Sequence, residues 1–279
     1  MAGHATHRWI VVLDIENFSV RTDPVQRSVR AAMYETLKSA MERSGLPVED
    51  IVCEDRGDGV LMIAPGTVSP LLLAGPFIRE LDDELAQKSA MFSKAHALRF
   101  RVSLHQGLAV QDAEGWSGDA VNTACRLVDA QPLRDVLVAA PSARMVFIVS
   151  DETYRGVIRH GHRGIDPAAY LPMRFATKHG EVVHSWITVP GYPAPPGLPP
   201  VGEDDDGGNG GGGGKGGGGE GGGGEGGGPA APAGPVGPGG QQAPGGAYRP
   251  VTFHTGTVQG DQFAGDKTVN VNTTGPVRP

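Results

Sequence analysis

The sequence predicts an α/β protein in which a sheet and its packed helices occupy about the first 190 residues, followed by a disordered Gly/Pro-rich region. Two observations support this prediction. Short apolar or alternating runs, which are typical of strands, take turns with longer segments in which apolar residues recur at helical spacing. After position 193 the composition changes abruptly, because most of the 44 Gly and 23 Pro residues lie there.

The first strand and the first helix have the clearest signals. The apolar run Ile10–Leu13 predicts a buried strand that ends at Asp14. A helix is expected to begin at Asp23, because proline follows it and proline is favoured in a first helical turn. Its apolar face is formed by Val29, Met33, Leu37 and Met41.

The remaining elements are predicted from the same two periodicities. Strands are expected at 51–53, 59–63, 98–110, 146–149 and 182–189. Helices are expected at 71–90, 118–130 and 150–153, with a helix or turn at 135–140. The predicted order is β-α-β-β-α-β-α-β-α-β, with an acidic, glycine-rich hairpin turn at 54–59.

Charge and composition exclude several classes of protein. A net charge of -7 argues against a general nucleic-acid or anionic-membrane binder, which usually presents a basic face. No segment approaches about 18 consecutive apolar residues, so no membrane span is expected. Cys53 and Cys125 are the only cysteines, which favours a reducing compartment. We therefore expect a cytoplasmic protein.

Three segments are expected along the chain: a domain at 1–192, a flexible linker at 193–247 and a short C-terminal motif at 248–279. In the last segment Gly-Asp pairs recur and β-branched residues alternate with polar ones. This pattern leaves two interpretations open. The segment is either a disordered tail or an interaction tail that pairs with a partner or with copies of itself as stacked strands.

Asp14 and Asp58 form the first candidate site. A buried carboxylate needs a partner because burying a lone charge is costly, so Asp14 requires a cation, hydrogen-bond donors or a metal. The alternative is a strand-end residue that caps an Asx-turn. Asp58 lies in a turn beside a strand that is able to pair with the Asp14 strand. Two carboxylates at neighbouring strand ends suit hard cations such as Mg²⁺.

Asn122 and Arg126 form the second candidate site. They lie four residues apart in the predicted helix at 118–130 and therefore share one face. An amide and a guanidinium on one face suit a ribose and a phosphate. An ordinary helix with a surface arginine is the alternative for such a pair.

Five blocks in order resemble the class III nucleotide cyclases, the adenylyl and guanylyl cyclase catalytic domains. The blocks are Leu13–Ser19, Gly57–Gly59, Arg101–Gly107, Gly118–Leu127 and Ser150–Tyr154. The resemblance covers roughly residues 8–190 and implies a ferredoxin-like class III nucleotide cyclase fold. It also implies that a nucleoside triphosphate is converted to a 3′,5′-cyclic nucleotide and pyrophosphate, for intracellular signalling.

The resemblance implies a role for each matched residue. Asp14 and Asp58 would bind two Mg²⁺ or Mn²⁺ ions, with the Ile15 carbonyl as a further ligand. Asn122 would orient the ribose, and Arg126 would stabilise charge on the phosphates. Lys178 is matched to a lysine that contacts phosphate. In this family the aspartates come from one subunit and the Asn/Arg pair from the other, so a homodimer is implied.

Two positions are matched to the residues that select the base. Glu54 stands where adenine-selective relatives have lysine, and a carboxylate accepts hydrogen bonds from guanine. The second position falls at Gly115, which has no side chain. The resemblance therefore favours GTP or a pyrimidine nucleotide over ATP.

The chain also departs from the family pattern. Glu16 and Asn17 replace residues that are usually smaller, and the segment from Gly107 to Gly118, which usually carries a hairpin, is short. The alternative function is therefore a weak or inactive cyclase-like module that binds nucleotide or dimerises and recruits partners through its tail.

Overall fold

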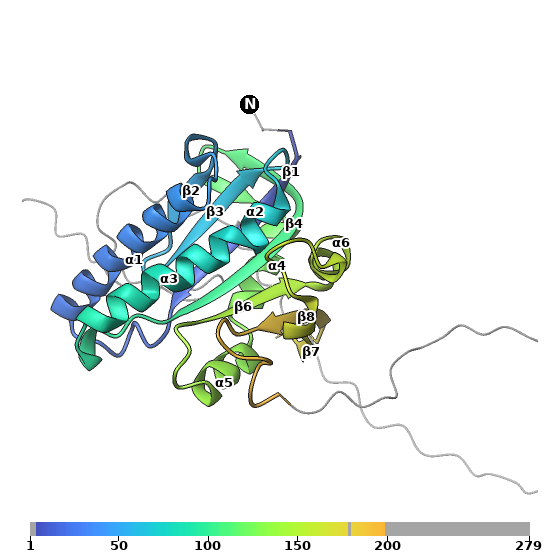
Figure 1. The fold of residues 1–279 in the computed structure, drawn as a ribbon. Coiled ribbons are helices and arrows are strands. Elements are labelled where there is room, and N and C mark those ends of the chain that lie inside the picture. Colours follow the sequence, from blue (N-terminus) through green and yellow to red (C-terminus); the bar gives the residue numbers. More distant parts are fainter. Residues whose placement is uncertain (1–3, 178–179, 199–279) are drawn as a thin grey trace, which may run out of the picture. The chain divides into compact units, whose positions relative to one another are not determined.

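The computed structural model describes residues 4–177 and 180–198, which form one sheet with helices on both faces (Figure 1). The sheet has the strand order β2-β3-β1-β4-β6-β8-β7, and β5 pairs with β4. The strands are β1 (Thr6–Ile15), β2 (Val52–Asp55), β3 (Gly59–Pro65), β4 (Phe100–Asp112), β5 (Gly115–Ser117), β6 (Met145–Ser150), β7 (Leu171–Ala176) and β8 (Val182–Thr188). The α-helices are α1 (Asp23–Arg43), α2 (Pro70–Ala74), α3 (Pro76–Met91), α4 (Asp119–Val128), α5 (Gln131–Ala139) and α6 (Asp151–Gly156).

The central strand β1 is buried on both of its faces. Because side chains alternate along a strand, Val11 and Leu13 face the helices α1 and α3, which lie side by side on the sheet (Figure 1). Ile10 and Val12 point to the opposite face, which is covered by α4. Strands in a sheet with helices on both faces are continuously apolar. The apolar run Ile10–Leu13 therefore correctly predicted a buried strand.

The first four sequential strands have the ferredoxin-like order β2-β3-β1-β4. β1 pairs antiparallel with both β3 and β4, whereas β4 and β6 are parallel and are joined by α4 and α5. A parallel pair requires such a helical crossover. The predicted fold class is confirmed.

The prediction of one long helix at 71–90 is wrong in one respect. The structure has two helices there, α2 and α3, which are separated at Gly75. Pro76 begins α3, and a residue that precedes proline is disfavoured in the helical region of φ/ψ space. Helical periodicity on both sides of Gly75 concealed this break.

Two strands were missing from the prediction. β7 contains Pro172, which weakens a strand signal, but β7 is an edge strand, where proline is tolerated. β5 is only three residues long, which is too short for a periodicity. It pairs antiparallel with β4, so the short segment between Gly107 and Gly118 still forms a hairpin.

Packing of the described chain extends past the expected start of the linker at 193. Tyr192 and Leu198 contact the apolar cluster that includes Leu133, Val136 and Leu137 of α5. The rest of the predicted linker and the tail at 248–279 lie outside the described residues. Within the described ranges, no helix is long and apolar enough to cross a membrane.

Candidate active site

Asp14 and Asp58 are brought together where β1 pairs with β3. Asp14 lies opposite Gly59, the first residue of β3. Asp58 directly precedes Gly59, and its carbonyl oxygen accepts a hydrogen bond of 2.9 Å from the Ile15 amide. The charge of Asp58 also raises the pKa of Asp14. The two aspartates therefore share one electrostatic environment at adjacent strand ends.

Gly59 makes this close pairing possible. A Cβ atom at position 59 would collide with the Leu13 carbonyl oxygen on β1. Only glycine lacks a Cβ atom and permits such an approach of two backbones. The glycine that follows Asp58 thus keeps the two strand ends paired, and with them the two aspartates.

Asp14 is a buried carboxylate with a basic partner. Arg101, which lies opposite it on β4, donates a hydrogen bond to Oδ2 of Asp14 and forms an ion pair with it. The side chains of Asp14 and Arg101 are 13% and 9% exposed. Burial raises the pKa of Asp14 to about 7; Arg101 opposes this rise, whereas Asp58 and Asp129 add to it.

The expectation that Asp14 has a partner is confirmed, although Arg101 was not identified as that partner. The sequence contains one signal for it. Arg101 is a charged residue between Phe100 and Val102, two buried residues of a well-patterned strand. A charged side chain at such a position needs an opposite charge on the same face of the sheet.

Glu16 is directed to a basic partner of its own. Its Oε2 lies 3.1 Å from Nη1 of Arg99. Arg99 also donates hydrogen bonds to the carbonyl oxygens of Leu137, Ala140 and Ala143 at 2.5–2.8 Å. These contacts hold the guanidinium in place, so the charge of Glu16 is balanced.

Asn17 occupies a backbone conformation that explains its presence. Its φ of 55° lies in the left-handed region, where asparagine is the best tolerated residue after glycine. Arg21 holds the loop together by donating to the carbonyl oxygens of Glu16 at 3.0 Å, Asn17 at 3.1 Å and Ala97 at 2.9 Å. The two departures from the family pattern are therefore accommodated by local contacts.

The donor set at the aspartates fits Mg²⁺ or Mn²⁺. Mg²⁺ is commonly held by one or two carboxylates together with substrate phosphates, and Asp14, Asp58 and the Ile15 carbonyl oxygen supply such a set. Across residues 4–177 and 180–198, no group of three or more His, Cys, Asp or Glu residues is arranged to hold a metal by itself.

Asn122 and Arg126 both lie on α4, as predicted. Asn122 is exposed, and Nη1 of Arg126 lies 3.0 Å from Oε2 of Glu181. Glu181 directly precedes β8, whereas Asp14 lies on β1, and the sheet order places β4 and β6 between these strands. In one chain the guanidinium of Arg126 is thus paired with an acidic residue beside β8.

Glu54 and Gly115 lie next to each other, although 61 positions separate them in the sequence. A Cβ atom on Gly115 would lie 2.9 Å from Oε1 of Glu54. The other carboxylate oxygen, Oε2, lies 3.1 Å from Nη2 of Arg56. The sequence analysis did not identify Arg56 as a neighbour of Glu54. The two residues are two positions apart in an extended segment, so their side chains project to the same side.

The last predicted site residue, Lys178, lies outside the described residues.

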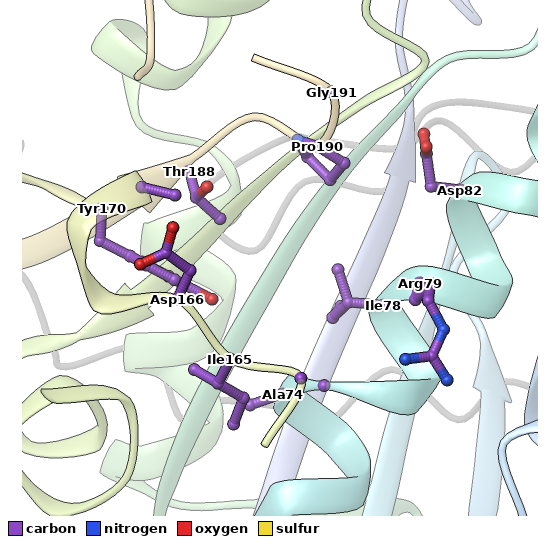
Figure 2. A pocket seen from close by; sticks show the side chains of 13 residues that line it. Ala74, Ile78, Arg79, Asp82, Ile165, Asp166, Tyr170, Thr188, Pro190 and Gly191 are labelled. Atoms are coloured by element: carbon purple, nitrogen blue, oxygen red, sulfur yellow. The ribbon is translucent and has the colours of Figure 1, made fainter. Parts of the chain in front are cut away.

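Two cavities lie elsewhere in the described part. One of about 280 Å³ is lined by residues such as Ile78, Tyr170 and Thr188 (Figure 2). Another of about 570 Å³ has His105 in its wall. Among the described residues, no sequence-predicted site residue lines either cavity.

Comparison with known proteins gives matches to solved structures only. No protein-family model matches the sequence, and a search of curated proteins finds no match. A crystal structure of an adenylate/guanylate cyclase/hydrolase from Silicibacter pomeroyi matches with a TM-score of 0.50 and 16% identity, over 68% of this chain and 99% of that chain. The guanylyl cyclase Cya2 matches with a TM-score of 0.49 and 14% identity, over 67% and 94%.

A third solved structure is the guanylate cyclase domain of RhGC from Catenaria anguillulae in complex with GTP. It matches with a TM-score of 0.43 and 19% identity, over 66% of this chain and 97% of that chain. At these identities the likeness concerns the fold, and the Silicibacter pomeroyi structure carries it. Together with the strand order and the five sequence blocks, it shows that this chain has the fold of the class III adenylyl/guanylyl cyclase catalytic domains.

Proposed function

We propose that this chain is a nucleotide cyclase that converts a nucleoside triphosphate to a 3′,5′-cyclic nucleotide and pyrophosphate. GTP or a pyrimidine nucleotide is favoured over ATP as the substrate. The observation that carries the proposal is the meeting of Asp14 and Asp58 at the paired ends of β1 and β3. The reaction is an attack of the ribose 3′-hydroxyl on the α-phosphate.

Asp14, Asp58 and the Ile15 carbonyl oxygen would hold two Mg²⁺ or Mn²⁺ ions. When bound, such ions favour ionisation of the attacking hydroxyl and offset charge on the leaving pyrophosphate. Arg101 contacts Oδ2 of Asp14, which leaves Oδ1 available for an ion. Arg101 thus acts as a positioning residue that orients the Asp14 carboxylate from behind.

Asn122 and Arg126 would act on the nucleotide from a second copy of the chain. Asn122 would orient the ribose, while Arg126, with Lys178, would stabilise charge on the phosphates. The resemblance to the cyclase family supports a homodimer, in which a two-fold axis would bring the half-site of one copy to that of the other. For this role Arg126 must exchange Glu181 for phosphate.

The test is an assay with the four common nucleoside triphosphates. The purified full-length protein is incubated with each of them and Mn²⁺, and the products are identified by mass spectrometry. A 3′,5′-cyclic nucleotide is expected from the wild type and not from Asp58→Ala. If a folded wild type yields no cyclic product from any of the four, the proposal fails, and a module that only binds nucleotide or dimerises is favoured.

The cyclic product would act as an intracellular signal. The tail at 248–279 is kept as a proposed interaction tail on a flexible linker, for a protein partner or for self-association. Its test is deletion of residues 246–279, which should abolish that association while the described domain keeps its thermal stability.

A further inference from the structure

The pairing of Glu54 with Arg56 bears on which base this site selects. Glu54 lies in β2 and Arg56 directly follows the last residue of that strand, so their side chains, two positions apart, project to the same side. Nη2 of Arg56 lies 3.1 Å from Oε2 of Glu54. The side chain of Arg56 is 38% exposed and that of Glu54 is 27% exposed, so both are accessible to a ligand.

Gly115 lies beside the other carboxylate oxygen of Glu54. A Cβ atom at position 115 would be 2.9 Å from Oε1 of Glu54, which is tighter than side-chain contacts allow. The absence of a side chain on Gly115 therefore lets Oε1 occupy this space. One oxygen of Glu54 is held by Arg56, and the other lies against the β4–β5 hairpin.

The charge of Arg56 also acts on the helix that carries Asn122 and Arg126. Burial raises the pKa of the Cys125 thiol on α4, and the charge of Arg56 opposes that rise. Arg56 and Cys125 therefore interact electrostatically. Among the described residues, one acidic side chain, that of Glu54, lies within ion-pair distance of the Arg56 guanidinium.

We propose that Arg56 is a specificity-determining residue that, together with Glu54, selects a base with a ring N–H beside a carbonyl oxygen. Guanine and uracil have this edge, whereas adenine and cytosine carry an amino group beside an unprotonated ring nitrogen. The inference rests on the proposed cyclase function and deepens it, because it names the substrate class as an oxo-base nucleoside triphosphate.

The chemistry of the two side chains leads to this class. Arg56 occupies Oε2 of Glu54, which leaves Oε1 as an acceptor for one ring N–H. The guanidinium has five N–H donors, so it can contact Glu54 and still donate to the base. A carbonyl oxygen has two lone pairs and can accept two such charge-assisted bonds, whereas the ring nitrogen of adenine or cytosine accepts one.

The test compares the four nucleoside triphosphates in wild type, Arg56→Gln and Arg56→Lys. Wild type is expected to turn over GTP or UTP with a kcat/KM at least about tenfold above that for ATP and CTP, in line with the discrimination given by a bidentate base contact. Arg56→Gln should lose most of this ratio, a fall of about tenfold. Arg56→Lys should retain part of it, because lysine keeps the charge but not the planar fork.

Arg43→Gln is the matched control. Arg43 is a partly exposed arginine near the end of α1 that also pairs with a glutamate, Glu80, at 2.9 Å. Its substitution should leave the ratio between oxo and amino bases unchanged. The thermal midpoint of Arg56→Gln is measured alongside, so that a loss of folding is recognised.

The outcomes separate this inference from the proposed function. The inference is overturned, while cyclase activity stands, if the wild type prefers ATP or CTP. It is also overturned if Arg56→Gln has the same ratio of kcat/KM between oxo and amino bases as the wild type. If no triphosphate is cyclised, the proposed function fails. The role of Arg56 in base selection is then tested by the thermal stabilisation that each triphosphate gives. Stabilisation by GTP or UTP that is lost in Arg56→Gln supports the role of Arg56; equal or absent stabilisation overturns it.

Discussion

At Asp14, burial and charge act in opposite directions on one carboxyl group. Removal from water favours the neutral acid, while Arg101 favours the carboxylate, and the balance raises the pKa to about 7. Because the folded-state pKa lies above the ordinary value, the bound proton stabilises the metal-free fold at low pH. That contribution is lost as the pH rises through 7.

The metal affinity of the site should therefore depend on pH. Mn²⁺ must displace the proton of Asp14 below pH 7, so its affinity should fall about fivefold from pH 7 to pH 6 and should level off well above pH 7. Calorimetric titration of the nucleotide-free protein measures this dependence. An affinity that stays constant from pH 6 to 8 would mean that Asp14 is ionised throughout this range.

Asn17 allows a test of the loop between β1 and α1. Its φ of 55° suits asparagine or glycine, so Asn17→Gly should leave the thermal midpoint and turnover close to those of the wild type. Asn17→Val should cost about 1–3 kcal/mol, because a β-branched residue is strained in the left-handed region. Equal stability of the two variants, measured by denaturant unfolding, would show that this conformation is not required.

At the scale of the elements, the site depends on two strand ends being held in register. Gly59 pairs with Asp14 across β3 and β1, and its backbone approaches the Leu13 carbonyl too closely for any side chain. The same pairing places Asp58 next to Ile15. The pairing of the two strands therefore also sets the positions of the proposed metal ligands.

Substitution of Gly59 should damage both stability and the site. Gly59→Ala should lower the free energy of unfolding by about 1–3 kcal/mol, because β3 must move away from β1 to admit the methyl group. Mn²⁺ affinity should fall with it. Gly156→Ala is the control, since a Cβ atom there meets nothing within 4 Å. Similar effects of both substitutions in denaturant titrations would contradict this account.

At the scale of the whole molecule, the candidate residues divide into two groups. Asp14 and Asp58 lie at the ends of β1 and β3, while α4 carries Asn122 and directs Arg126 toward Glu181. Two copies related by a two-fold axis would form two identical sites, each with one group from each copy. In the proposed dimer, activity would therefore require both copies of the chain.

Mixing two inactive variants tests this requirement. Asp58→Ala and Arg126→Ala should each lack cyclase activity alone. After exchange of subunits half of the dimers are mixed, and each mixed dimer has one intact site of two, so about a quarter of wild-type activity should return. Asp58→Ala mixed with Asp14→Ala is the control and should stay inactive. No recovery in the first mixture, despite proven exchange, would contradict a shared site.

Short-range patterns were enough to predict much of the fold and the identity of the candidate residues. The apolar run before Asp14, the spacing of Val29, Met33, Leu37 and Met41 and the alternation around Val102 each depend on neighbours along the chain. Such patterns decide which face of an element is buried, because strand and helix periodicities are local properties. The blocks around Asp58, Asn122 and Arg126 then indicated the chemistry.

The partners of those residues were decided only by the tertiary structure. Arg101 meets Asp14 through the register of β1 and β4, and Arg56 meets Glu54 where Gly115, 61 positions away, leaves room. Contacts between residues distant in sequence depend on strand order, register and packing, which no local pattern encodes. The sequence by itself indicated most of the elements and the candidate residues; the tertiary structure decided which charges neutralise one another and which carboxylate oxygens remain available.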